Sequence, residues 1–218
     1  MRSLRADLDR PAIDAFLSAA DAVMNSNTLL LKARSDAPLN DQNAAATLGS
    51  FLEDPLFLEM MLAADRIRGW YNLQEHVPET GGFAAGGTGS LVRGSGALTL
   101  DRLDAAGFAD RLVWMLCDSS SPYRRHLGRE RAKGLVEAFM REVLDPGSRP
   151  VTGDGARSDW SRTGWSFVSV RPDFLCSTGY HTGEPPEDPA YFDGGDSDTA
   201  SLFYRDDVFY LLLTNGSP

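Results

Sequence analysis

The first two thirds of the chain place apolar residues three and four positions apart, the spacing that predicts amphipathic helices. The first helix is predicted to begin at Pro11, which suits a first helical turn. Its apolar face consists of Ile13, Phe16, Leu17, Ala20 and Met24. A second helix is predicted over about 42–53, and Asp54-Pro55 is typical of a cap and first-turn proline that begin a third helix.

Two further helices are predicted between positions 99 and 145. Thr99 is expected to cap a helix whose apolar stripe is Leu103, Phe108, Leu112 and Leu116. The next helix has an apolar face made of Leu135, Val136, Phe139, Met140 and Val143. Asp145-Pro146-Gly147 is expected to end it.

The last third of the chain has short alternating or apolar runs that predict strands over 165–170, 174–180, 199–204 and 208–214. Arg205-Asp206-Asp207 is expected to join the last two as a hairpin. The run over 208–214 is apolar nearly throughout, so we expect this strand to be central and covered on both faces. Helices followed by strands predict an α+β fold with helices packed on a short antiparallel sheet. We expect a single domain over 1–218, helical over 1–150 and strand-rich over 160–216.

Charge and composition exclude several classes of function. The formal net charge is −10 at pH 7, which argues against nucleic acid or an anionic membrane as the main partner. No apolar run approaches the roughly 18 residues that a membrane helix needs, and no export signal is visible. The two cysteines, Cys117 and Cys176, fit a reducing compartment, so we expect a cytoplasmic protein. No histidine or cysteine has zinc-ligand spacing, and neither a metal nor a cofactor is expected.

Two segments have an unusual composition. The glycine-rich stretch over 80–96 lacks the lysine of a P-loop and the third glycine of a dinucleotide fingerprint, so it is interpreted as a flexible crossing loop. The stretch over 184–198 carries six acidic residues and no basic one. It lacks the spacing of a calcium-binding EF-hand and is interpreted as a solvated acidic loop.

Three short elements carry a resemblance to a known family. They are 25–31 (NSNTLLL), the triplet His181-Thr182-Gly183, and the closing pattern in which SLFY over 201–204 precedes LLLTNG over 211–216. In this order and spacing they resemble the β-lactamase and penicillin-binding-protein-like serine hydrolases, especially the class C and esterase branch. That family has a Tyr-Ser-Asn element, a Lys/His-Thr/Ser-Gly triplet on an edge strand and a similar closing hairpin. The resemblance covers residues 20–218 and is strongest over 164–216.

The resemblance implies a partial β-lactamase-like fold and hydrolysis of an ester or amide in a small-molecule or peptide substrate. It places Ser26, Asn27 and His181 in the catalytic machinery. Substrate binding would fall to Thr182, Gly183 and Glu184, with the N–H of Glu184 helping to bind the oxyanion. If this holds, Ser26 or Asn27 faces the His181 triplet across one groove.

The chain departs from the family at the nucleophile. It contains no Ser-x-x-Lys, since Leu29 and Glu130 stand three residues before Lys32 and Lys133. Asn25 stands where the family has its general-base tyrosine. We therefore interpret the chain as a partial or degenerate member that is inactive without an upstream Ser-x-x-Lys. Purified alone, it should not be acylated by a fluorescent penicillin or turn over a short ester.

Two other hypotheses remain. The chain could be a non-catalytic acidic binding or immunity-type protein, because a net charge of −10 suits a basic partner. The exposed edge of a shortened sheet would be a natural place for another protein chain to pair. Alternatively, Cys117 or Cys176 could act with a histidine in a cysteine hydrolase. The position of Cys117 at the end of an apolar helix face favours a buried small hydrophobe instead.

Overall fold

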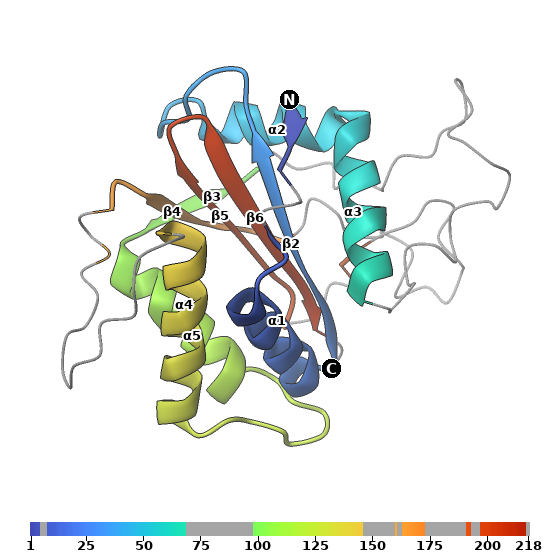
Figure 1. Ribbon diagram of the computed structural model, residues 1–218, viewed down its shortest axis with the longest axis vertical. Coiled ribbons are helices and arrows are strands. Elements are labelled where there is room, and N and C mark those ends of the chain that lie inside the picture. The colour runs from blue at the N-terminus through green and yellow to red at the C-terminus, as the bar shows by residue number, and fades with distance from the viewer. Residues whose placement is uncertain are drawn as a thin grey trace, which may run out of the picture.

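The computed structural model describes residues 1–4, 8–68, 98–145, 160, 163–172, 191–192 and 197–216. These residues form an antiparallel sheet with helices on both faces (Figure 1). The strands are β1 (Arg2–Ser3), β2 (Ser26–Arg34), β3 (Leu100–Leu103), β4 (Ser166–Val170), β5 (Thr199–Arg205) and β6 (Val208–Gly216). The helices are α1 (Pro11–Met24), α2 (Ala44–Glu53), α3 (Pro55–Arg68), α4 (Ala105–Cys117) and α5 (Arg129–Leu144). The predicted α+β class is confirmed.

The strand order is β1-β2-β6-β5-β4-β3, with every neighbouring pair antiparallel. The prediction of a β5–β6 hairpin is confirmed, and Asp206 adopts φ 54° in its turn. β6 lies between β2 and β5 and is buried along most of its length, as its apolar sequence predicted. It pairs with β2 from Ser26↔Gly216 to Arg34↔Val208. The predicted strand over 174–180 lies outside the described residues.

The alternation of side chains along the strands divides the core into two layers. One layer contains α1, α4 and α5, which pack on Leu30, Phe203 and Leu212. The other contains α2 and α3, which pack on the neighbouring positions Leu29 and Leu213. Because both faces are covered, the central strands are apolar on both faces rather than on alternate residues.

Three strands, β1, β2 and β3, were not predicted, because the first two thirds of the chain was interpreted as helical. β2 follows α1 after a single residue, Asn25, whose φ of 51° lets the chain reverse from helix to strand. Its apolar run was assigned to the family resemblance rather than to a strand. β3 occupies the start of the helix predicted from Thr99, because Leu100–Leu103 pairs with β4. The cap of α4 is Asp104, whose Oδ1 accepts from the N–H of Gly107 at 2.6 Å.

No helix in the described part of the chain is long and apolar enough to cross a bilayer.

Gly216 is expected to be required at the end of β6. A Cβ atom there would lie 3.0 Å from the carbonyl oxygen of Ser197 and closer still to its Cβ. Gly216→Ala should therefore lower the free energy of unfolding by about 1–3 kcal/mol, since the backbone must shift. Gly134 in α5 has open space around its Cβ position, so Gly134→Ala should raise stability by about 0.5–1 kcal/mol. Urea unfolding of both variants checks this; a harmless Gly216→Ala would contradict the packing described.

Candidate functional site

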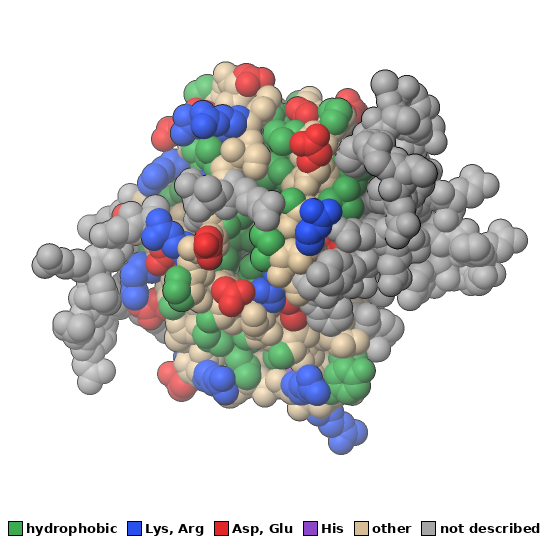
Figure 2. Space-filling model, turned by 45° about the vertical axis from the view of Figure 1, so that its right-hand side comes forward, with side chains coloured by type: hydrophobic (Ala, Val, Ile, Leu, Met, Phe, Trp, Pro, Cys, Tyr) green, Lys and Arg blue, Asp and Glu red, His purple; other side chains and the backbone are tan. Residues whose placement is uncertain are grey.

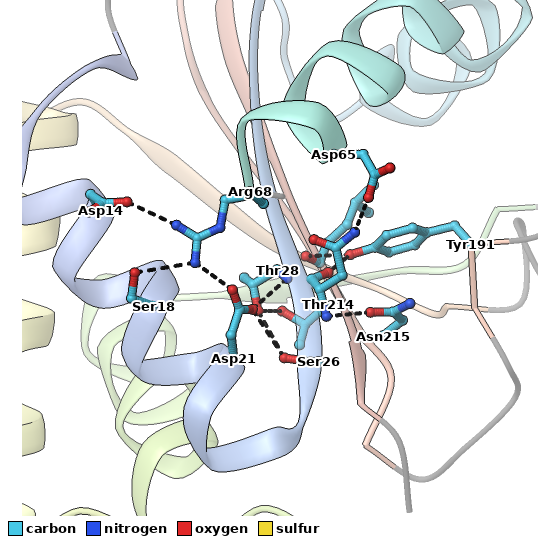
Figure 3. Close-up of polar contacts among 12 residues, drawn as sticks. Asp14, Ser18, Asp21, Ser26, Thr28, Asp65, Arg68, Tyr191, Thr214 and Asn215 are labelled. Carbon is cyan, nitrogen blue, oxygen red and sulfur yellow. Dashed lines mark hydrogen bonds and ion pairs between the residues drawn. The ribbon is translucent and has the colours of Figure 1, made fainter. Parts of the chain in front are cut away.

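A buried polar cluster lies where the end of α1 meets the beginning of β2 (Figure 3). The sharp reversal at Asn25 brings Asp21, in the last turn of α1, beside Ser26 and Thr28. Asp21 Oδ1 accepts from the backbone N–H of Thr28 at 2.7 Å and from Ser26 Oγ at 3.4 Å. Thr28 Oγ1 lies 3.1 Å from Ser26 Oγ and 3.4 Å from Thr214 Oγ1. The hydroxyl groups thus have protein partners in place of water.

Arg68, the last residue of α3, reaches across the edge of β2 to α1 (Figure 3). Its Nη1 donates to Asp14 Oδ1 at 2.9 Å, and its Nη2 donates to Asp21 Oδ2 and to Ser18 Oγ. The Arg68 side chain is 11% exposed and that of Asp21 is 8% exposed, whereas Asp14 is 75% exposed. The Arg68–Asp21 pair therefore carries most of the link between helices on opposite faces of the sheet.

Burial raises the pKa of the Asp21 carboxyl above its ordinary value. The hydrogen bond and charge of Arg68 act in the opposite direction, as do the hydrogen bonds from Thr28, but they do not outweigh the desolvation. The carboxylate is held in place by partners that do not fully offset the loss of water. Removing the arginine would leave this charge uncompensated.

A second group of polar contacts lies on the other face of β2. Asn27 Nδ2 donates to Asp65 of α3, and the backbone N–H of Asn27 donates to Asn215 Oδ1 at 2.7 Å. The Tyr191 hydroxyl donates to the carbonyls of Asn27 and Leu213. Burial raises the pKa of Tyr191 well above its ordinary value, and nearby carboxylates act in the same direction. Tyr191 is thus a protonated donor and cannot serve as a general base near neutral pH.

A groove of about 740 Å³ runs beside the cluster, between α1 and α3. Its lining is largely apolar and includes β2 at positions 29–31, Ile13 and Leu17 of α1, and Met60, Ala64 and Ile67 of α3. Arg68 and Asp14 also line it, so the bridge between the two helices borders the groove. Cavities of this size that combine apolar walls with a few polar groups are typical binding sites.

Main-chain groups of β2 also face the groove. The carbonyl of Lys32 accepts from the N–H of Leu4, and the N–H of Thr28 bonds to Asp21, so even-numbered residues of β2 present their backbone groups outward. The N–H and C=O of Leu30 therefore point away from β6. β1 pairs with Ala33 and Arg34, and no described strand lies alongside Leu30. Among the described residues, this part of the edge therefore has no partner strand between β1 and the carboxylate of Asp21.

The structure places two of the predicted catalytic residues in the two groups of polar contacts, on opposite faces of β2. Ser26 faces Asp21, and Asn27 faces Asp65. Each is only 1% exposed. The prediction that either one faces His181 stays a prediction, because His181, Thr182, Gly183 and Glu184 lie outside the described residues.

The cysteine-hydrolase hypothesis gains no support from the described residues. Cys117 is partly buried, and burial raises the pKa of its thiol, with the charge of Asp118 adding to the shift. A raised pKa disfavours the thiolate that acts as nucleophile. Cys176 lies outside the described residues. Within the described ranges no group of three or more His, Cys, Asp or Glu side chains could hold a metal ion.

The residues that sequence reasoning missed are Asp21, Asp65, Arg68 and Tyr191. One signal was present: Asp21 and Asp65 stand at helix positions whose neighbours one turn away are apolar and buried. A carboxylate on such a face has to be paired or hydrogen-bonded. The identity of the partners depends on tertiary structure and could not be obtained from spacing.

No protein-family model, curated protein or solved structure matches the chain.

Breaking the bridge at Arg68 should be far more damaging than removing its exposed partner. Arg68→Met leaves the Asp21 carboxylate buried without a cation, so we expect a loss of about 3–5 kcal/mol in the free energy of unfolding at neutral pH. The loss should shrink as pH falls, because Asp21 can then take up a proton in the folded state. Asp14→Asn removes a largely exposed ion pair and should cost about 0–1 kcal/mol. Urea unfolding across a pH series measures both; equal losses, or a pH-independent loss in Arg68→Met, would contradict this account.

Proposed function

We propose that the protein is a non-catalytic binding protein whose groove between α1 and α3 takes an extended segment of a basic partner protein. The observation that carries this proposal is the edge of β2 at Leu30, which no described strand covers and which lies in a groove lined mainly by apolar side chains. Main-chain N–H and C=O groups at the edge of a sheet pair with an added strand, and pockets beside that strand select its side chains.

The position of the groove supports an extended occupant rather than a helical one. A strand added beside β2 would continue the row that β1 begins at Ala33 and Arg34. Its side chains would alternate between the two walls, one formed by Ile13 and Leu17, the other by α3. Both walls are apolar, so the segment would carry apolar residues on both faces over its central part.

The charges around the groove support a basic partner. Arg10 lies 3.6 Å from Glu142, and Arg68 is bound by two carboxylates, so neither arginine is available to an anion. Asp9 is exposed at the groove, and Asp14, although it is paired with Arg68, keeps 75% of its side chain exposed there. Together with a net charge of −10, this arrangement would attract lysine and arginine side chains and speed association with a positively charged protein.

The environment of Ser26 favours binding over catalysis. A serine nucleophile needs access to the substrate and a base that accepts its proton. Ser26 is 1% exposed, and its neighbour Asp21 is already engaged with Thr28 and Arg68. The hydroxyl is therefore used within the fold. A role in hydrolysis would require His181 and a nucleophile from elsewhere to meet it.

Filling the groove should weaken partner binding without removing any polar contact. Ala64 is half-buried and lines the groove, whereas Ala46 is exposed on α2 and does not line it. Peptides selected from a random display library against the purified protein should have a central run of apolar residues flanked by lysine or arginine. Ala64→Phe should weaken their binding by about tenfold or more, which corresponds to about 1.4 kcal/mol. The matched variant Ala46→Phe should bind them as the wild type does.

A second measurement uses the wild-type protein, so its result does not depend on whether Ala64→Phe folds. In the wild-type protein, binding of a selected peptide should shift the amide resonance of Leu30 and protect it from hydrogen exchange. Peptides that bind Ala64→Phe as tightly as the wild type, or that leave Leu30 unaffected, would contradict the proposal. A library that yields no binding peptide would contradict it as well.

A further inference from the structure

The segment between α4 and α5 is basic, although the molecule as a whole is acidic. Residues 121–133 (SPYRRHLGRERAK) contain five of the 21 basic residues of the chain and one acidic residue, in a protein of net charge −10. The segment lies at the end of the molecule opposite α2 (Figure 1). Basic and apolar side chains are visible along the lower edge of Figure 2, at the level of this segment. We call residues 123–133 the basic segment.

The backbone before α5 is held in place by several hydrogen bonds. The N–H of Leu127 donates to the carbonyl of Leu116 at 2.8 Å, and the Leu127 side chain packs against the core. His126 Nε2 lies 2.8 Å from the carbonyl oxygen of Ser119. The N–H of Arg124 donates to the carbonyl of Ser121 at 2.9 Å. The cations are thus presented by an ordered backbone, which lowers the conformational entropy lost on binding.

Three arginines of the basic segment have no carboxylate partner among the described residues. Arg129 pairs with Asp118 at 3.1 Å, and Lys133 pairs with Glu130 at 3.0 Å. The three arginines without such a partner in the described ranges are Arg124, Arg125 and Arg131.

An exposed aromatic ring lies beside one of these three arginines. The guanidinium of Arg125 lies 5.1 Å from the ring centroid of Tyr123, and Tyr123 is 60% exposed. The surface therefore offers guanidinium groups beside an exposed ring.

We propose that the basic segment is a second interaction surface, which binds a short acidic segment of a partner protein. Guanidinium groups bind carboxylates through paired hydrogen bonds, and the ring of Tyr123 adds apolar contact area. The remainder of the chain is strongly acidic, so a long polyanion such as nucleic acid would be repelled wherever it extended beyond the basic segment. A short run of Asp and Glu satisfies the arginines without meeting that repulsion.

Charge reversal within the basic segment tests this proposal. A fluorescently labelled oligoglutamate peptide is titrated with the purified protein at low salt, and an oligothymidylate serves as the comparison. Arg125→Glu combined with Arg131→Glu should weaken peptide binding by about tenfold or more. The matched control combines Arg2→Glu with Arg171→Glu, which changes the net charge equally at exposed positions away from the segment. It should retain binding within about twofold.

Each other outcome would overturn the proposal. Absence of peptide binding, or an equal loss in the control variant, would show that the segment has no particular affinity for carboxylates. Tighter binding of the oligothymidylate would assign the surface to nucleic acid instead. The proposal is independent of the groove, so Ala64→Phe should bind the oligoglutamate peptide as the wild type does.

Discussion

The carboxylate of Asp21 is the constraint on which the arrangement of this molecule depends. One of its oxygens accepts the outward N–H of Thr28, and the other binds Arg68. The bond to Thr28 occupies the outward N–H at that position of β2, so a further strand cannot pair with it. The bond to Arg68 joins α1 to α3, which lie on opposite faces of the sheet. The burial that raises the pKa of Asp21 also makes the pair intolerant of the loss of either member.

A short part of the edge of β2 has no partner strand among the described residues. β1 covers β2 at Ala33 and Arg34, Asp21 covers it at Thr28, and Leu30 lies between them. Because α1 and α3 lie on either side of this part of the edge, the main-chain groups of Leu30 lie at the base of a groove with apolar walls. Proteins usually cover or block such edges, since they are templates for pairing with another chain.

Local patterns predicted α1, α2, α3, α5 and the β5–β6 hairpin, because apolar spacing, proline positions and turn residues determine them with little help from the rest of the chain. They did not predict β2, whose apolar run is equally compatible with a buried helix, or β3, whose residues form a strand only because β4 lies beside them. Sequence reasoning also selected Ser26 and Asn27, which do lie in the two groups of polar contacts. It could not identify Asp21 or Arg68 as their neighbours, since those contacts join three elements that are distant in the sequence.

Amide hydrogen exchange of the free protein tests most directly whether the edge of β2 at Leu30 is unpaired. The N–H groups of Leu29 and Leu31 point toward β6 and pair with it, while that of Leu30 points into the groove. The account predicts that Leu30 exchanges many times faster than its two neighbours under native conditions, although its side chain is just as buried. Protection of Leu30 equal to that of Leu29 and Leu31 would show that the edge is already paired, and would contradict the proposed binding site.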